Sequence, residues 1–171
     1  DILKNIPSIK KTIVFNYDQK EKEDIKNFIN FNDTLESNLD NSFEKFEFNH
    51  PIYILFSSGT TGKPKCITHG AGNVLIEHNK EFILHCEIKE NDRLFYYTTT
   101  GWMMWNWLVG GLATGSSIFL FDGAPVYPKI SILLEYCQNK KINLFGVSAK
   151  YIDHLKNEKF SGMNLDLKFL K

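Results

Sequence analysis

The stretch from Tyr53 to His69 constrains this chain most, because it places a loop of small polar residues between two short apolar runs. The first run, YILF, is rich in aromatic and β-branched residues. The second run alternates apolar and polar residues. Ser, Thr, Gly, Lys and Pro make up the loop itself. This order predicts a strand, a loop and a second strand over 66–68.

The composition of the loop favours an anion-binding site. Ser57 opens a run of six small residues that ends at Gly62, and such short side chains leave backbone N–H groups and hydroxyls free to converge on one concave spot. Lys63 and Lys65 flank Pro64, which has no N–H, so two cations lie within reach of a bound group. A polyphosphate fits this loop best. An ordinary polar hairpin turn is the alternative interpretation.

The spacing of the glycines excludes the P-loop of nucleotide hydrolases. In that motif the second glycine follows the first by five residues and precedes Lys and then Ser or Thr. Five residues after Gly59 stands Pro64. The loop is also predicted to lead into a strand, whereas a P-loop leads into a helix.

The eight residues 58–65, SGTTGKPK, resemble the signature loop of the adenylate-forming superfamily, which includes acyl-CoA synthetases, adenylation domains of peptide synthetases and luciferases. In that superfamily the loop contacts the β- and γ-phosphates of ATP. The resemblance implies a catalytic role for Lys65. For Lys63 it implies contact with phosphate, and the alternative is that this side chain simply faces solvent. The phosphate-binding residues that it implies are Ser57, Ser58, Gly59, Thr60, Thr61, Gly62, Lys63 and Lys65.

Other stretches resemble one group in this superfamily, the acetoacetyl-CoA synthetases. They are the run 98–107, the turn 122–125 and the run 145–152, and the resemblance covers 49–171. In related acetyl-CoA synthetases, the two residues after the Gly-Trp pair help to wall the acyl pocket and are small or hydroxylated. Here those residues are methionines, which favours an acid other than acetate, although methionine also serves as core filler. The predicted substrate residues are Gly101, Trp102, Met103 and Met104.

The resemblance implies a two-step ligation that uses ATP, Mg²⁺ and coenzyme A as co-substrate. A small carboxylic acid attacks the α-phosphate of ATP to give an acyl adenylate and pyrophosphate, and the thiol of coenzyme A then displaces AMP. We expect acetoacetate or a similar acid. The alternatives are another short acid, such as acetate or propionate, and a non-catalytic phosphate-binding module.

Several functional residues of the superfamily cannot be assigned within these 171 residues. They are the residues that contact adenine, ribose and magnesium, and the lysine of the mobile C-terminal domain. We therefore expect a fragment that is inactive alone, whose partner is the remainder of the synthetase, and we predict no metal ligand here. His78 and His85 lack a third ligand at metal spacing. His69 is a better functional candidate, with a structural hydrogen bond as the alternative.

Composition and charge exclude other classes. A formal net charge of +0 gives no basic surplus for nucleic acid. Three separated cysteines without a CxxC pair predict a reducing compartment, the cytoplasm. Residues 94–121 carry no charge, and Gly111 and Gly115 form a GxxxG pattern, so a membrane span is an alternative there. Its polar residues leave no apolar run of bilayer length, which favours a buried strand, helix and strand.

We predict an α/β fold with a largely parallel sheet flanked by helices. Residues 1–49 are predicted to be a peripheral polar segment of the same domain, with a strand over 11–16, a helix over 21–30 and phenylalanines that dock on the main body. Residues 50–171 are predicted to be the nucleotide-binding core, truncated at its C-terminal end. Ligand contacts should gather at the carboxyl ends of its strands.

The core is predicted to alternate helices and strands after the loop. The helix over 71–86 should bury Ala71, Val74, Leu75, Phe82, Ile83 and Cys86. The other predicted elements are a strand over 93–97, a helix from Gly101 to Ala113, a strand over 117–121, a helix over 128–139, a strand over 143–147, a helix capped by Ser148 and a strand over 165–171.

Overall fold

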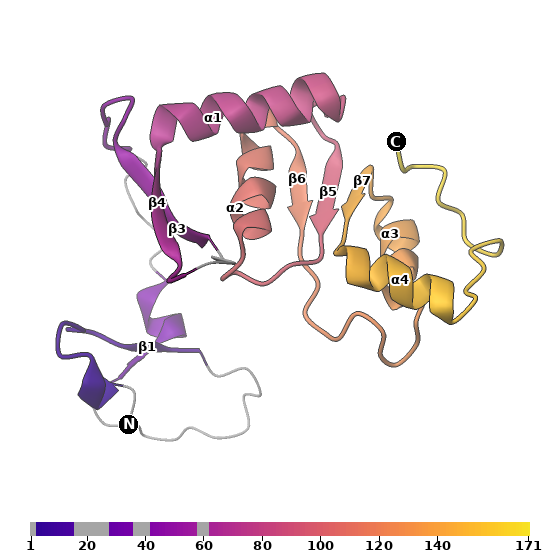
Figure 1. Ribbon diagram of the computed structural model, residues 1–171, viewed down its shortest axis with the longest axis horizontal. Helices are drawn as coiled ribbons and strands as arrows, with labels where there is room; N and C mark the ends of the chain where they lie inside the picture. Colours follow the sequence, from indigo (N-terminus) through magenta and orange to yellow (C-terminus); the bar gives the residue numbers. More distant parts are fainter. Residues whose placement is uncertain (1–2, 16–27, 36–41, 58–61) are drawn as a thin grey trace. The chain divides into compact units, whose positions relative to one another are not determined.

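The computed structural model describes residues 3–15, 28–35, 42–57 and 62–171 (Figure 1). The chain divides into two compact units, Asp1–Lys45 and Phe46–Lys171.

The first unit contains short elements. They are the 3-10 helix η1 (Leu3–Asn5), the parallel strands β1 (Ile13–Val14) and β2 (Ile29–Asn30), and the 3-10 helix η2 (Phe31–Thr34). The predicted strand over 11–16 is confirmed in β1. The predicted helix lies mostly outside the described residues, and at Ile29 it is wrong. The N–H of Ile29 donates to the carbonyl of Thr12 at 3.0 Å, so this residue pairs with another strand.

The phenylalanines before the hairpin differ in their packing. The ring of Phe48 lies where a Cβ on Gly72 would come within 2.2 Å of it, so the absence of a side chain at Gly72 lets Phe48 dock. Phe46 stacks on His50 with ring centroids 4.3 Å apart. Phe43, in the first unit, is 88% exposed, and its docking on the main body stays a prediction.

The second unit begins with a hairpin that leads directly into a helix. Strands β3 (Pro51–Ser57) and β4 (Lys65–Gly70) are antiparallel, and helix α1 (Ala71–Asn79) follows without a break. A π-helical turn, η3 (Lys80–His85), continues α1. The two predicted strands and the predicted helix over 71–86 are therefore confirmed, with β4 longer than expected.

A parallel three-stranded sheet forms the centre of this unit (Figure 1). Its strands are β5 (Arg93–Tyr96), β6 (Ser117–Phe119) and β7 (Leu144–Gly146), in the order β6-β5-β7. The register aligns two rows of apolar side chains across all three strands. One row is Leu94, Ile118 and Leu144, and the other is Phe95, Phe119 and Phe145. Because successive side chains point to opposite faces, each face of the sheet receives one row.

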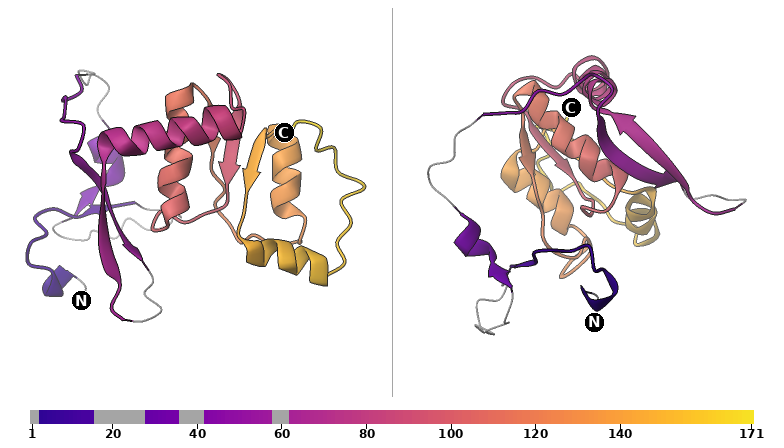
Figure 2. Two further views of the ribbon diagram at one scale, coloured as in Figure 1. Left: turned by 45° about the horizontal axis from the view of Figure 1, so that its top comes forward. Right: turned by 90° about the vertical axis from the view of Figure 1, so that its left-hand side faces the viewer.

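Helices cover both faces of this sheet (Figure 2). Helix α2 (Met103–Gly110), its 3-10 continuation η4 (Gly111–Thr114) and η3 lie on the face of Leu94, where Phe82 and Leu108 are buried. Helices α3 (Ile132–Lys140) and α4 (Ala149–Asn157) lie on the face of Phe95, where Leu133 and Tyr151 are buried. A parallel sheet buried on both faces is typical of α/β proteins. The predicted fold class is confirmed.

The predicted buried face of α1 and η3 is only partly correct. Phe82 is fully buried, but Leu75 and Ile83 are 54% and 48% exposed. The inward positions on α1 include Val74 and His78. His78 therefore lies on the inward side of α1. The periodicity of apolar residues did not predict this, because it considers only apolar side chains.

Two predicted boundaries also change in the second half. Helix α3 starts at Ile132, four residues after Pro128, because turns fill the intervening residues. The predicted cap of α4 is confirmed: Ser148 Oγ accepts from the N–H of Tyr151 at 3.4 Å. No strand forms over 165–171, where turns interrupt the backbone. One backbone bond, from Lys171 to the carbonyl of Asn143 at 3.0 Å, joins this segment to the residue before β7.

The uncharged stretch 94–121 folds into β5, α2, η4 and β6. Among the described residues, no helix is long and apolar enough to cross a membrane.

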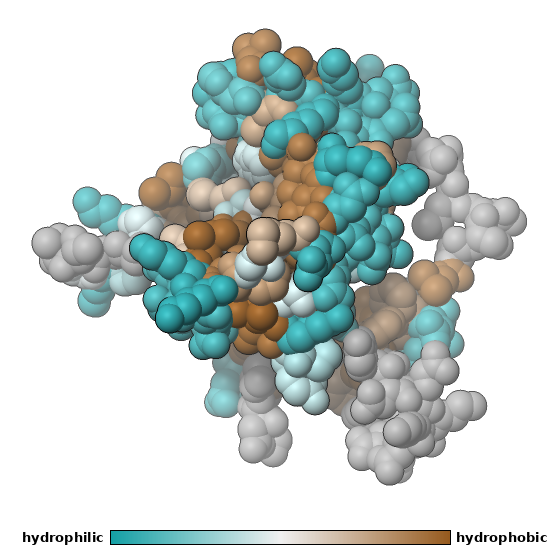
Figure 3. All heavy atoms as spheres, turned by 90° about the vertical axis from the view of Figure 1, so that its right-hand side faces the viewer, coloured by the Kyte–Doolittle hydropathy of each residue, from teal (hydrophilic) through white to brown (hydrophobic). Residues whose placement is uncertain are grey.

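The surface formed at the α3 and α4 end is largely hydrophilic, with apolar side chains gathered in a band between polar areas (Figure 3). Helix α4 has one side exposed to solvent and one side buried. Its Lys150 and Asp153 are exposed, whereas Tyr151 is buried against the sheet. This division is what an amphipathic helix on a sheet requires.

We expect truncation of a buried leucine in the core to reduce the free energy of unfolding strongly. Leu133 is fully buried, so Leu133→Ala should lower the free energy of unfolding by about 2–5 kcal/mol. Leu84 is 71% exposed, so Leu84→Ala should change it by only about 0.5 kcal/mol. Urea unfolding of both variants measures the difference. Equal losses in the two variants would contradict the assignment of Leu133 to the core.

A second prediction concerns pH. Burial raises the pKa of Asp92, but hydrogen bonds from Lys171 Nζ and from the N–H of Lys89 outweigh it, so the pKa lies below its ordinary value. The ionised carboxylate therefore stabilises the fold above the unfolded pKa, and this contribution is lost as pH falls through the folded pKa.

We accordingly expect Asp92→Asn to lower the free energy of unfolding at about pH 7 and to have a much smaller effect at about pH 3. Urea unfolding at the two pH values tests this. Asp153, exposed on α4, supplies the control: Asp153→Asn should have little effect at either pH. A pH-independent loss in Asp92→Asn would contradict the assignment.

Candidate functional site

The hairpin brings two of the predicted phosphate-binding residues together. Ser57, the last residue of β3, is the register partner of Lys65, the first residue of β4. Gly62 and Lys63 lie between them, and a Cβ on Gly62 would meet nothing within 4 Å. Lys63 and Lys65 are exposed. The other predicted residues of the loop, Ser58, Gly59, Thr60 and Thr61, lie outside the described residues.

The side chains of Ser57 and Lys65 share a face with residues that line a cavity. Directly opposite residues of an antiparallel pair point to the same side, and side chains alternate along each strand. Ser57 therefore lies on the side of Leu55 and Tyr53, and Lys65 on the side of His69. Leu55, Tyr53 and His69 all line the cavity, whereas Ser57 and Lys65 follow on the same face of the hairpin and are not part of the lining.

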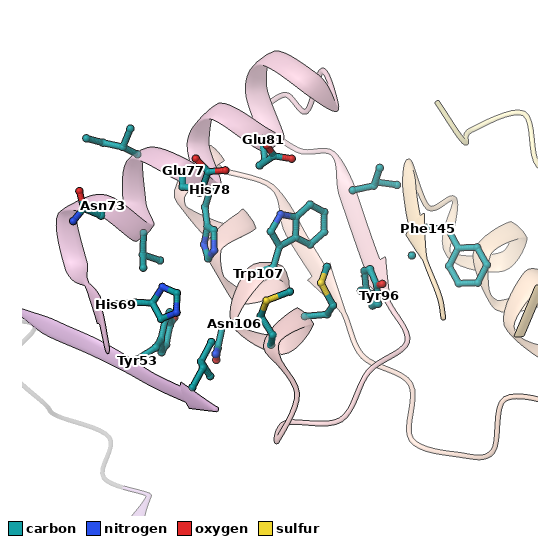
Figure 4. A pocket seen from close by; sticks show the side chains of 17 residues that line it. Tyr53, His69, Asn73, Glu77, His78, Glu81, Tyr96, Asn106, Trp107 and Phe145 are labelled. Carbon is teal, nitrogen blue, oxygen red and sulfur yellow. The ribbon is translucent and has the colours of Figure 1, made fainter. Parts of the chain in front are cut away.

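The cavity has a volume of about 930 Å³ and lies among the hairpin, α1, α2 and the strands β5 and β7 (Figure 4). Its lining combines apolar and aromatic side chains with a few polar groups, which is typical of small-molecule sites. Its lining residues are Tyr53, Leu55, His69, Asn73, Val74, Ile76, Glu77, His78, Glu81, Tyr96, Met103, Met104, Asn106, Trp107, Leu144, Phe145 and Gly146.

The cavity reaches the carboxyl ends of two neighbouring parallel strands. Tyr96 ends β5 and Gly146 ends β7. From β5 the chain goes first to β6 on one side and then to β7 on the other, so β5 and β7 flank a topological switch point, where α/β proteins bind ligands. A Cβ on Gly146 would lie 2.0 Å from the Tyr96 ring. Gly146 therefore lets this ring cross the strand end.

The predicted substrate residues fall into two pairs. Met103 and Met104, in the first turn of α2, both line the cavity. Gly101 and Trp102 are exposed and do not line it. Trp102 stands at the N-cap of α2, so this pair sets where the helix begins.

Trp107 is the tryptophan that joins the cavity to the core. Its ring lies 4.2 Å from that of Phe82 and 6.1 Å from that of Tyr96, measured between centroids. These contacts fix one wall of the cavity.

The two histidines and two asparagines of the lining lack a side-chain hydrogen bond to any described residue. They are His69, Asn73, His78 and Asn106. Glu77 and Glu81 differ, because Lys80 Nζ lies 2.8 Å from Glu77 Oε1 and 3.4 Å from Glu81 Oε1. The four uncommitted groups therefore retain donors and acceptors for a ligand.

His78 is held between α1 and α2. It is half-buried, and its ring lies edge-on to that of Phe82 with centroids 6.5 Å apart. A Cβ on Gly110 would come within 2.1 Å of Nδ1, so this glycine makes room for the imidazole. Burial lowers the pKa of His78 and the nearby Glu77 carboxylate partly offsets this, so the ring is neutral at pH 7. In Figure 4 the ring points from α1 into the space beside α2.

Sequence reasoning missed several residues of this cavity. Tyr96, Asn106 and Trp107 were not assigned to a site, and His78 was considered only as a metal ligand. The position of Tyr96 at the end of a parallel strand was the available signal. Nothing in the sequence marks Asn106, because its role depends on which face of α2 meets the hairpin. Among the described residues, no group of three or more His, Cys, Asp or Glu side chains could hold a metal ion.

Comparisons with known proteins agree with this geometry. Residues 2–170 match the family described as AMP-binding enzyme. The acetoacetyl-coenzyme A synthetase of Rhizobium meliloti (strain 1021) is 52% identical over 119 residues, covering 70% of this chain and 18% of that protein. The malonamoyl-CoA synthetase of Penicillium aethiopicum is 43% identical over 131 residues, covering 68% and 18%.

A solved structure shares the fold. Acetoacetyl-CoA synthetase from Streptomyces lividans superposes with a TM-score of 0.87 at 35% identity, covering 98% of this chain and 26% of that one. The chain thus spans about a fifth to a quarter of the length of these relatives. With a family match over almost its whole length, the chain belongs to the AMP-binding enzyme family, the adenylate-forming enzymes.

Proposed function

We propose that this chain is the part of an ATP-dependent acid–CoA ligase that binds the phosphates of ATP and the acyl group of the acid. The observation that carries the proposal is the single cavity wall shared by the hairpin and α2. Tyr53, Leu55 and His69 of the hairpin line the same cavity as Met103 and Met104 of α2, and Ser57 and Lys65 lie further along the same face of the hairpin. A ligase of this kind must hold a nucleotide and an acid side by side.

The phosphate end of the site is proposed to lie at the loop. Lys65 carries a positive charge next to Ser57, and the open space at Gly62 allows close approach to the backbone. Adenylyl transfer depends on positioning and on neutralising charge that develops on phosphate oxygens. We propose Lys65 as the catalytic cation. Ser57, Ser58, Thr60, Thr61 and Lys63 are the proposed side-chain partners, with Gly59 and Gly62 giving backbone access.

The acyl end is proposed to lie at the start of α2, where Met103 and Met104 line the cavity and Gly101 and Trp102 set the helix start. The two named relatives are synthetases for acetoacetyl-CoA and malonamoyl-CoA. Both acyl groups carry a second carbonyl at C3. We therefore propose a short acid with a C3 carbonyl as the substrate, acetoacetate first.

The proposed reaction also needs Mg²⁺ and coenzyme A. Mg²⁺ would neutralise the phosphates of ATP, and the described residues supply hydroxyl and lysine partners for those phosphates but no carboxylate set for the ion. We propose that residues for magnesium, adenine, ribose and coenzyme A belong to the remainder of a longer synthetase. The cysteines of this chain are free thiols, which supports the cytoplasm as its location.

The proposal is tested by acid-dependent exchange of labelled pyrophosphate into ATP, catalysed by the full-length enzyme that carries this chain. We expect exchange with acetoacetate, and slower exchange with butyrate, propionate and acetate. Butyrate has the same number of carbons as acetoacetate but lacks the C3 carbonyl. Absence of exchange with every acid would overturn the ligase proposal and favour a non-catalytic phosphate-binding module.

Lys65 provides the matched test of the loop. Lys65→Ala in the full-length enzyme should reduce exchange by roughly a hundredfold or more, because the cation acts on charge that develops in the transition state. The melting temperature should hardly change, since Lys65 is exposed. Lys150, exposed on α4, supplies the control, and Lys150→Ala should retain full exchange. A loss of stability that parallels the loss of exchange would instead assign Lys65 a structural role.

A further inference from the structure

The cavity contains a polar group that neither the phosphate loop nor the methionines explain. His78 lies on α1, on a wall shared with Met103, Met104 and Trp107, which are apolar or aromatic. The chain accommodates this ring at a cost, because Gly110 must lack a side chain for the imidazole to fit. Gly110 is the last residue of α2, and glycine is less favourable than alanine in a helix. The residue pair is therefore arranged to present an imidazole to the cavity.

The hydrogen-bonding groups of this imidazole are uncommitted. Neither ring nitrogen of His78 has a hydrogen-bond partner in the part of the chain that the structure describes. A neutral imidazole carries one N–H donor and one acceptor nitrogen. A half-buried donor without a partner is unfavourable unless a ligand or water satisfies it.

We propose that His78 is a specificity-determining residue of the acyl site, and that its imidazole N–H donates a hydrogen bond to the C3 carbonyl oxygen of the acid. This inference rests on the proposed ligase function and deepens it. A carbonyl oxygen accepts hydrogen bonds and cannot donate them, so it complements the free N–H. An acid without the C3 oxygen leaves that donor unpaired in a largely apolar wall, which is a strong basis for discrimination.

The other histidine of the cavity is less suited to this role. His69 is the register partner of Tyr53 on the hairpin, four residues after Lys65, and so lies on the strand that leads from the phosphate loop. His78 instead lies against Gly110 of α2, the helix that carries Met103 and Met104 (Figure 4). The tail of the acid, rather than its carboxylate, is thus proposed to meet His78.

The charges near His78 favour a neutral acyl tail. Glu77 and Glu81 line the same cavity, and Lys80 forms ion pairs with both, which leaves one net negative charge among these three groups. No lysine or arginine lines the described cavity. A second carboxylate on the acid would lie in an unfavourable potential, whereas a ketone or an amide carries no charge.

The test compares acetoacetate with butyrate in the pyrophosphate exchange assay of the full-length enzyme. His78→Leu should lower kcat/KM for acetoacetate by roughly ten- to a hundredfold and leave that for butyrate nearly unchanged. His78→Gln keeps an N–H donor and should restore part of the preference. His154→Leu, on the exposed surface of α4, is the matched control and should leave both values unchanged.

A second variant tests the proposal even if the His78→Leu protein fails to fold. In Gly110→Ala the new Cβ would displace the imidazole without removing it, so the preference for acetoacetate should also fall. Equal losses for both acids, or a preserved preference in His78→Leu and Gly110→Ala, would overturn the role of His78. A wild-type enzyme that shows no exchange with either acid would overturn the ligase proposal itself, and with it this inference.

Discussion

The structure of the second unit depends on one constraint, the burial of β5 on both of its faces. Leu94 and Phe95 are adjacent in the chain and are both almost fully buried, 0% and 2% exposed. Because neighbouring side chains of a strand point in opposite directions, two separate layers of helices must cover them. Helix α2 and η3 cover one face, and α3 and α4 cover the other. The positions of β6 and β7 on either side of β5 follow from these crossovers.

The same constraint creates the cavity. With β5 at the centre and the chain passing from β6 on one side to β7 on the other, the carboxyl ends of β5 and β7 lie at a switch point that no crossover helix fills. Tyr96 can turn across that end because Gly146 has no side chain. The hairpin and α1 complete the space from the Leu94 side. The order of the strands therefore creates the cavity, and the side chains that line it determine how polar it is.

Most of the fold could be predicted from the sequence, because alternation and helical periodicity are strong where both faces of an element are buried. Predictions failed where a local pattern competed with tertiary packing. The buried stripe of α1 includes His78, so a rule that follows apolar residues selected Leu75 instead. Residues 165–171 alternate like a strand but turn before they can pair. For the site, the two methionines that line the cavity were predictable, whereas Asn106 and Trp107 depend on how α2 packs.

The distribution of charge along the site would also orient the proposed acid substrate. Lys63 and Lys65 provide positive charge at the loop, whereas the only formally charged lining residues of the described cavity are Glu77 and Glu81. In the proposed reaction a carboxylate would therefore be drawn toward the end of the cavity nearer the loop and the phosphates of ATP, and an uncharged tail would be left for α1 and α2. Lys80 does not line the cavity, but its ion pairs offset part of the negative charge of Glu77 and Glu81. This part of the cavity would therefore repel an anionic tail only weakly. Orientation of this kind would favour the position in which the carboxylate of the proposed substrate can attack.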